Sequence, residues 1–162
     1  MTFPRLDRLL DLLLLIVLAS MGTIVAANVF CRFVLNFSIY WGDEAAQALL
    51  VWLTFLGAAV AVRERAHYSF NYLALRSRGR ARLAIGIVGR LITIAAILGL
   101  LYWSTRVAIG IRPWIMPAME ISRFWVYAAG PVGSAFMLVY AVSDLFLAIR
   151  EHRLAPVTTA AT

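Results

Sequence analysis

The stretch that decides the fold runs from residue 45 to residue 62 and reads AAQALLVWLTFLGAAVAV. It holds eighteen consecutive residues without a charge, close to the roughly 20 apolar residues with which a helix crosses the hydrocarbon core of a bilayer. Hydrocarbon offers the backbone no hydrogen-bond partner, so a run of this kind has to be helical. The stretch therefore predicts a membrane-spanning helix.

Three further apolar runs accompany this one. Residues 12–31 and 124–143 carry no charge, and residues 83–105 carry only Arg90. Together the four runs predict an all-α integral membrane protein with four transmembrane helices, forming a single membrane domain over residues 1–162. With their interfacial ends included, we expect spans at about 10–33, 42–63, 83–106 and 123–149.

The composition excludes several classes of protein. Hydrophobic residues make up 63% of the chain and charged residues 14%, and the mean hydropathy is +0.85. Soluble domains average roughly 45–50% hydrophobic and about 25% charged residues. A small globule has too little interior to bury such an excess. A soluble enzyme, a disordered chain and a disulfide scaffold are thereby excluded, the last also because Cys31 is the only cysteine.

The arginines predict the orientation. All fifteen basic residues are arginine, against eight acids, and they flank the apolar runs, which favours membrane orientation over nucleic-acid binding. Ten fall on one side of the predicted spans and four on the other, so both termini are expected in the cytoplasm. The ten are Arg5, Arg8, Arg63, Arg65, Arg76, Arg78, Arg80, Arg82, Arg150 and Arg153.

The segment between the second and third spans has a mixed character. From His67 to Arg82 it combines aromatic residues and leucines with arginines. We expect a short amphipathic segment on the inner leaflet, with its basic side toward anionic phospholipid.

The two ends of the chain also allow expectations. The first apolar run exceeds the 7–15 residues of a signal-peptide core, which favours a retained span over a cleaved leader. The small, polar residues 155–162 are expected to form a disordered tail.

Few residues could carry catalysis. His67 and His152 both lie at the predicted cytoplasmic surface, where they could not ligate a haem at membrane depth. The sequence has no metal-ligand spacing and no GxSxG motif. We expect neither enzymatic activity nor a cofactor. A small multidrug transporter, in turn, would need a carboxylate within residues 12–31, and none is there.

Polar residues inside the spans point to contacts between helices. Arg90 and Asp144 have matching depths, so they either form an ion pair or extend separately to the headgroups. Trp52 lies near the centre of its span, where its indole N–H needs a partner. The run Gly130-Pro131-Val132-Gly133 indicates a kink, a close helix approach or ordinary packing.

A more specific pattern covers residues 28–67. It comprises N-V-F-C-R-F from residue 28, W-G-D-E from residue 41 and W-L-T-F-L-G-A-A from residue 52, then an arginine and a histidine. This pattern resembles the DctQ-type small membrane subunit of tripartite ATP-independent periplasmic (TRAP) transporters, in which each of these elements recurs in the same order. Its matching polar, aromatic and small positions are Asn28, Arg32, Trp41, Glu44, Trp52, Gly57, Arg63 and His67.

The resemblance implies a multi-pass protein of the bacterial inner membrane. Its implied partners are a large, DctM-type membrane subunit, which holds the substrate and sodium sites, and a periplasmic substrate-binding protein. The transported solute would be an organic acid anion, such as a C4-dicarboxylate or sialic acid. The small subunit would scaffold the large one and help to dock the binding protein. An alternative is an unrelated four-helix membrane assembly protein without transport activity.

The motif residues also allow a physical interpretation. Arg32 and Glu44 lie at the outer ends of consecutive helices, so they either pair across the turn, or Glu44 faces water or the binding protein. Trp41 is expected to anchor this turn at the membrane interface. Gly57 begins a patch of small residues that another helix could approach closely.

Overall fold

The computed structural model describes the backbone of residues 4–76 and 80–154, and the side chains of residues 4–64 and 86–150. Four long helices, each apolar enough to cross a membrane, confirm the predicted all-α fold with four spans. A single turn of helix precedes the last of them. The helices are α1 (Pro4–Val34), α2 (Gly42–Arg76), α3 (Arg80–Gly110), α4 (Phe124–Tyr127) and α5 (Ala129–Leu154).

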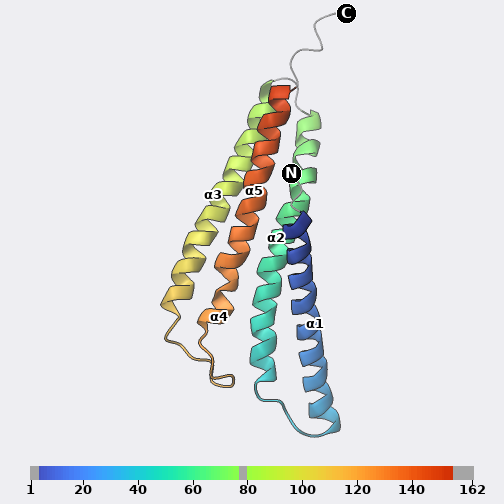
Figure 1. Cartoon of the computed structure of the whole chain (residues 1–162), viewed down its shortest axis with the longest axis vertical. Coiled ribbons are helices and arrows are strands. Elements are labelled where there is room, and N and C mark those ends of the chain that lie inside the picture. The colour runs from blue at the N-terminus through green and yellow to red at the C-terminus, as the bar shows by residue number, and fades with distance from the viewer. Residues whose placement is uncertain (1–3, 77–79, 155–162) are drawn as a thin grey trace, which may run out of the picture.

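The helices lie in the order α3, α5, α2, α1 across the molecule (Figure 1). The α2 and α5 helices pack against each other in the middle, while α1 packs on α2 and α3 packs mainly on α5. The backbones of α1 and α3 do not come close to each other in the described part of the chain. The two edge helices therefore depend on the central pair for their positions.

The expected amphipathic segment is not a separate element. The α2 helix continues through residue 64, where its apolar span ends, to Arg76. Between Gly57 and Gly79 the chain contains neither glycine nor proline, so nothing interrupts the helical hydrogen bonds. The side chains of 65–85, which include His67, and the predicted tail at 155–162 lie outside the described residues.

The fourth span is broken near its beginning. The α4 helix ends at Tyr127 and α5 begins at Ala129. Pro131 has no N–H to donate to the carbonyl of Tyr127, four residues earlier, so the helical ladder lacks a bond there. It resumes with the N–H of Val132, which donates to the carbonyl of Ala128 at 3.2 Å. Ala128, between the two helices, keeps a helical backbone (φ −61°, ψ −20°), so the interruption is confined to one residue.

The same run also brings α5 close to its neighbours. A Cβ on Gly133 would lie 2.7 Å from the Cβ of Phe55 and 3.0 Å from its carbonyl oxygen. A Cβ on Gly130 would lie 2.7 Å from the Cβ of Ser104. At these distances only glycine allows α5 to approach the backbone of α2 and a side chain of α3.

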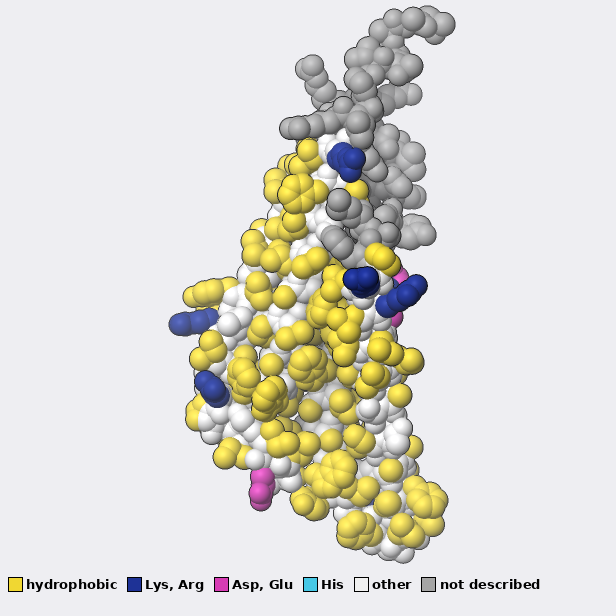
Figure 2. Space-filling view, in the orientation of Figure 1, with side chains coloured by type: hydrophobic (Ala, Val, Ile, Leu, Met, Phe, Trp, Pro, Cys, Tyr) yellow, Lys and Arg dark blue, Asp and Glu magenta, His cyan; other side chains and the backbone are white. Residues whose placement is uncertain are grey.

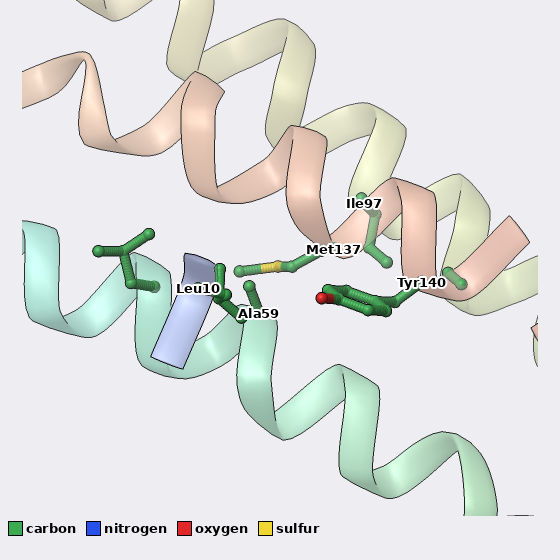
Figure 3. Packing of buried hydrophobic residues seen from close by; sticks show 7 residues of the cluster. Leu10, Ala59, Ile97, Met137 and Tyr140 are labelled. Carbon is green, nitrogen blue, oxygen red and sulfur yellow. The ribbon is translucent and has the colours of Figure 1, made fainter. Parts of the chain in front are cut away.

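The core is small and lies toward the end of the bundle where α1 begins. Side chains from all four long helices meet there (Figure 3). The buried members are Leu10, Leu56, Ala59, Ile97, Met137, Tyr140 and Ala141.

Most of the remaining apolar surface faces outward. Leu15 of α1 is 60% exposed, Ile92 of α3 64% and Phe146 of α5 68%. Figure 2 shows apolar side chains over most of the visible face of the helices. In water this surface would be unstable, as expected for helices whose outer faces lie in the hydrocarbon of a membrane.

We predict that Gly133→Ala destabilises the fold by about 1–3 kcal/mol, because the added methyl group would force α5 away from Phe55. The measurement is the free energy of unfolding in detergent. Gly99→Ala is the matched control, since a Cβ there meets nothing within 4 Å. Equal stabilities of the two variants would contradict the close approach.

Candidate functional site

The polar side chains of the spans form contacts at three levels along the bundle. We call the end that holds the α1–α2 turn and the loop of residues 111–123 the loop end; it is the predicted periplasmic end. The second level lies at the middle of the spans. The third lies at the opposite end, near the start of α1.

At the loop end, Asn28 holds the turn between α1 and α2. Its side-chain N–H donates to the carboxylate of Asp43 at 2.9 Å, and its carbonyl accepts the backbone N–H of Ile39 at 3.3 Å. A Cβ on Gly42 would lie 3.1 Å from the Asn28 amide. One amide therefore ties the last turns of α1 to the first residues of α2.

Glu44 fastens the second loop of this end. Its carboxylate oxygen Oε2 accepts the backbone N–H groups of Ala118 and Met119, both at 3.0 Å. Hydrogen bonds to an ionised acceptor are stronger than neutral ones, and the first turn of a helix favours a negative charge. Glu44 thus links the start of α2 to the loop that leads into α4.

Arg32 and Glu44, which the sequence allows to pair, do not form an ion pair. Among the described side chains, no ion pair joins them, because Glu44 is turned toward the 111–123 loop. Arg32 is exposed in the last turn of α1, where a positive charge is favourable. Of the alternatives that the sequence left open for these two residues, the pair is the one that this structure does not form.

At the middle level, the indole N–H of Trp52 donates to the backbone carbonyl of Trp125 at 3.1 Å. This confirms the expectation that Trp52 finds a protein partner. The small-residue patch is occupied by the chain's own helices: Leu14 of α1 lies 4.0 Å from a Cβ on Gly57, and Ala59 is fully buried.

A groove opens beside this contact, between α1, α2 and α4. Its cavity volume is about 380 Å³. Trp41, 39% exposed, lines the groove where the α1–α2 turn joins α2. The walls are mainly apolar and include Ile24, Leu49, Trp52 and Trp125.

At the third level, Arg90 of α3 and Asp144 of α5 form an ion pair. The guanidinium Nε lies 2.7 Å from the carboxylate Oδ2, and the side chains are 17% and 15% exposed. Of the two interpretations of these residues, the pair is the one that the structure forms. The pair joins α3 to α5. Each charge alone would be unfavourable in hydrocarbon, and pairing offsets part of that free-energy cost.

A second charged group, the Asp7 cluster, joins α1, α2 and α5. It consists of Asp7, Asp11, Arg63 and Tyr140. Arg63 Nη2 lies 2.9 Å from Asp11 and its Nη1 lies 4.0 Å from Asp7, while the Tyr140 hydroxyl donates to Asp7 at 2.8 Å. Three helices are therefore fixed to one another by a single network.

Only Arg63 of this cluster was among the predicted residues. The two aspartates precede the apolar run of the first span, and their spacing of four residues places them on one helical face. That spacing was the available signal. Their partners lie far away in sequence, so the sequence alone could not assign the contacts.

The contacts described above hold helices and loops of the chain together. Within the described residues, no group of three or more His, Cys, Asp or Glu side chains could hold a metal ion. Asn28, Glu44, Trp52 and Arg90 each use their polar atoms on another element of the same chain. Such a site can position membrane helices.

Comparison with known proteins identifies the family. Residues 21–151 match the family described as "Tripartite ATP-independent periplasmic transporters, DctQ component". The chain belongs to the DctQ family. As a DctQ protein it is a small permease component of a TRAP transporter and a multi-pass protein of the inner membrane. An unrelated membrane assembly protein is thereby excluded.

Three relatives show how far the likeness of this DctQ chain extends. The ectoine TRAP transporter small permease protein TeaB of Halomonas elongata is 31% identical over 90% of this chain and 77% of the relative. The sialic acid TRAP transporter small permease protein SiaQ of Vibrio cholerae is 23% identical over 80% and 75%. A putative TRAP transporter small permease protein of Haemophilus influenzae is 35% identical over 42% of each chain.

We predict that double-mutant cycles separate the two charged pairs considered for this DctQ protein. Arg90→Ala and Asp144→Ala should be strongly non-additive in unfolding free energy, each single change costing about 3–5 kcal/mol, because each removes one partner of a largely buried ion pair. The matched cycle of Arg32→Ala and Glu44→Ala should be additive within about 0.5 kcal/mol. Coupling between Arg32 and Glu44 would contradict the assignment of Glu44 to the 111–123 loop.

Proposed function

We propose that this DctQ chain scaffolds the large membrane subunit of a sodium-coupled, binding-protein-dependent transporter and coordinates neither solute nor ion itself. The proposal rests on the observation that the charged side chains of the spans form ion pairs with one another. Arg90 and Asp144 neutralise each other, and Arg63 is engaged by Asp7 and Asp11. A transport site needs ionisable groups that face a pathway, and these face other helices of the same chain.

The proposed solute is an organic acid anion. The class comes from the family resemblance, and the relative from Vibrio cholerae supports it, since its name assigns it to a sialic acid transporter. The relative from Halomonas elongata carries ectoine in its name. Family members thus serve different solutes, as expected if solute choice belongs to other subunits.

We also propose that the loop end helps to dock the periplasmic binding protein. Three aromatic side chains there are largely exposed: Phe37 at 62%, Tyr40 at 73% and Trp114 at 65%. Exposed aromatic residues are common anchors of protein interfaces and of the headgroup belt. The proposed orientation, with both termini in the cytoplasm, puts these residues on the periplasmic side, and the arginines of 76–82 next to anionic lipid.

Reconstitution tests the proposal. Proteoliposomes with this chain alone should take up no sialic acid or C4-dicarboxylate under a sodium gradient. Liposomes that also contain the cognate large subunit, supplied with the binding protein, should take up one organic acid in a sodium-dependent manner. Saturable uptake by this chain alone would contradict the scaffold role, and uptake by the full system without sodium would contradict the coupling.

A further inference from the structure

One amide on the membrane-spanning part of α2 has no partner among the described residues of the chain. Gln47 lies six residues beyond Trp41, about 9 Å deeper along the helix at 1.5 Å per residue. Its side chain is exposed and forms no hydrogen bond with any described residue. Lipid tails can neither donate to an amide nor accept from it, so Gln47 needs a polar partner from outside the chain.

The other polar groups at comparable depth are already satisfied. Asn28 bonds Asp43 and the turn, and Trp52 donates to a backbone carbonyl. Thr54 donates its hydroxyl to the carbonyl of Leu50 at 2.8 Å. Gln47 therefore differs from these polar side chains, because its amide has no hydrogen-bond partner among the described residues.

Gln47 belongs to a continuous exposed face of α2, which we call the Gln47 face. Its members are Gln47, Leu50, Thr54 and Ala61, all exposed. Their spacings of three, four and seven residues place them along one side of a helix. The side chains of Leu56 and Ala59 point to the core from the other side of α2. The face is narrow, with one amide and small or medium side chains that permit close helix packing.

We propose that a transmembrane helix of the large membrane subunit packs on the Gln47 face and supplies the hydrogen-bond partner of the Gln47 amide. This inference rests on the proposed function. Polar complementarity selects the occupant, because an acyl chain would leave the amide unpaired, whereas a helix with a Ser, Thr, Asn or backbone carbonyl at this depth would pair it. The apolar groove beside Trp41 has the opposite chemistry, since its mainly apolar walls need no hydrogen-bond partner.

Docking on this face also places the partner on a helix that is held by several neighbours. The α2 helix contacts both α1 and α5, and Asn28, Glu44 and Arg63 tie it to other elements at both ends of its span. A partner helix on α2 would therefore rest on an element that cannot tilt alone. The edge helices α1 and α3 offer apolar faces without such support.

Site-specific photocrosslinking tests the proposal on the intact complex with the cognate large subunit. A benzophenone side chain at Leu50 or Ala61 should crosslink to the large subunit at least about fivefold more than one at Ile92 on α3, which is 64% exposed. Crosslinks to a second copy of this chain, or to the large subunit only from Ile92, would overturn it. If the wild-type chain does not co-purify with the large subunit at all, the proposed function fails instead.

Removal of the amide provides the second test. Gln47→Leu should weaken association with the large subunit about tenfold in detergent, the effect of one lost interhelical hydrogen bond. Thr93→Val, on an exposed position of α3 whose hydroxyl bonds Gly89, is the matched control and should change the affinity less than twofold. The melting temperature of the isolated Gln47→Leu chain should stay the same or rise, which separates docking from folding. Unchanged affinity would overturn the proposal and show that the amide reaches the headgroups.

Discussion

The contact between Phe55 and Gly133 brings the backbones of α2 and α5 together, and the positions of the other helices depend on it. Lipid tails are as apolar as leucine side chains, so in a membrane the hydrophobic effect does little to hold one helix against another. Close van der Waals packing has to do so, and it requires that one backbone carries no Cβ at the crossing. The α1 helix then attaches to α2, and α3 attaches to α5.

Hydrogen bonds and ion pairs fix the packed helices to one another. Asn28 and Glu44 fix the loop end, Trp52 joins α2 to the start of the fourth span, and Arg90 joins α3 to α5 at the other end. Each of these groups would be costly if it faced hydrocarbon unpaired. The helix order is therefore set by the chain itself, which is what a subunit needs if it is to present a fixed surface to a partner.

The sequence predicted the parts of this structure that depend on local chemistry. Uncharged runs of the right length indicated the four spans, and a tryptophan in mid-span required a partner. The sequence could not predict contacts between residues that lie far apart in the chain. Glu44 binds backbone N–H groups of a loop more than seventy residues away, and a backbone donor leaves no signature in residue type. The Asp7 cluster joins side chains 133 residues apart, and the continuity of α2 through Arg76 follows from the absence of a helix breaker.

The most direct test of a self-sufficient scaffold is the distance between the two edge helices, whose backbones do not come close to each other in the described part of the chain. Spin labels at Leu15 on α1 and Ile92 on α3, both on exposed faces, can be introduced with Cys31 replaced by serine, and their separation measured by pulsed electron resonance. The account predicts one narrow distance distribution that is the same in the isolated chain and in the complete transporter. A broad distribution that narrows only when the large subunit is present would show that the partner, and not this chain, sets the order of the helices.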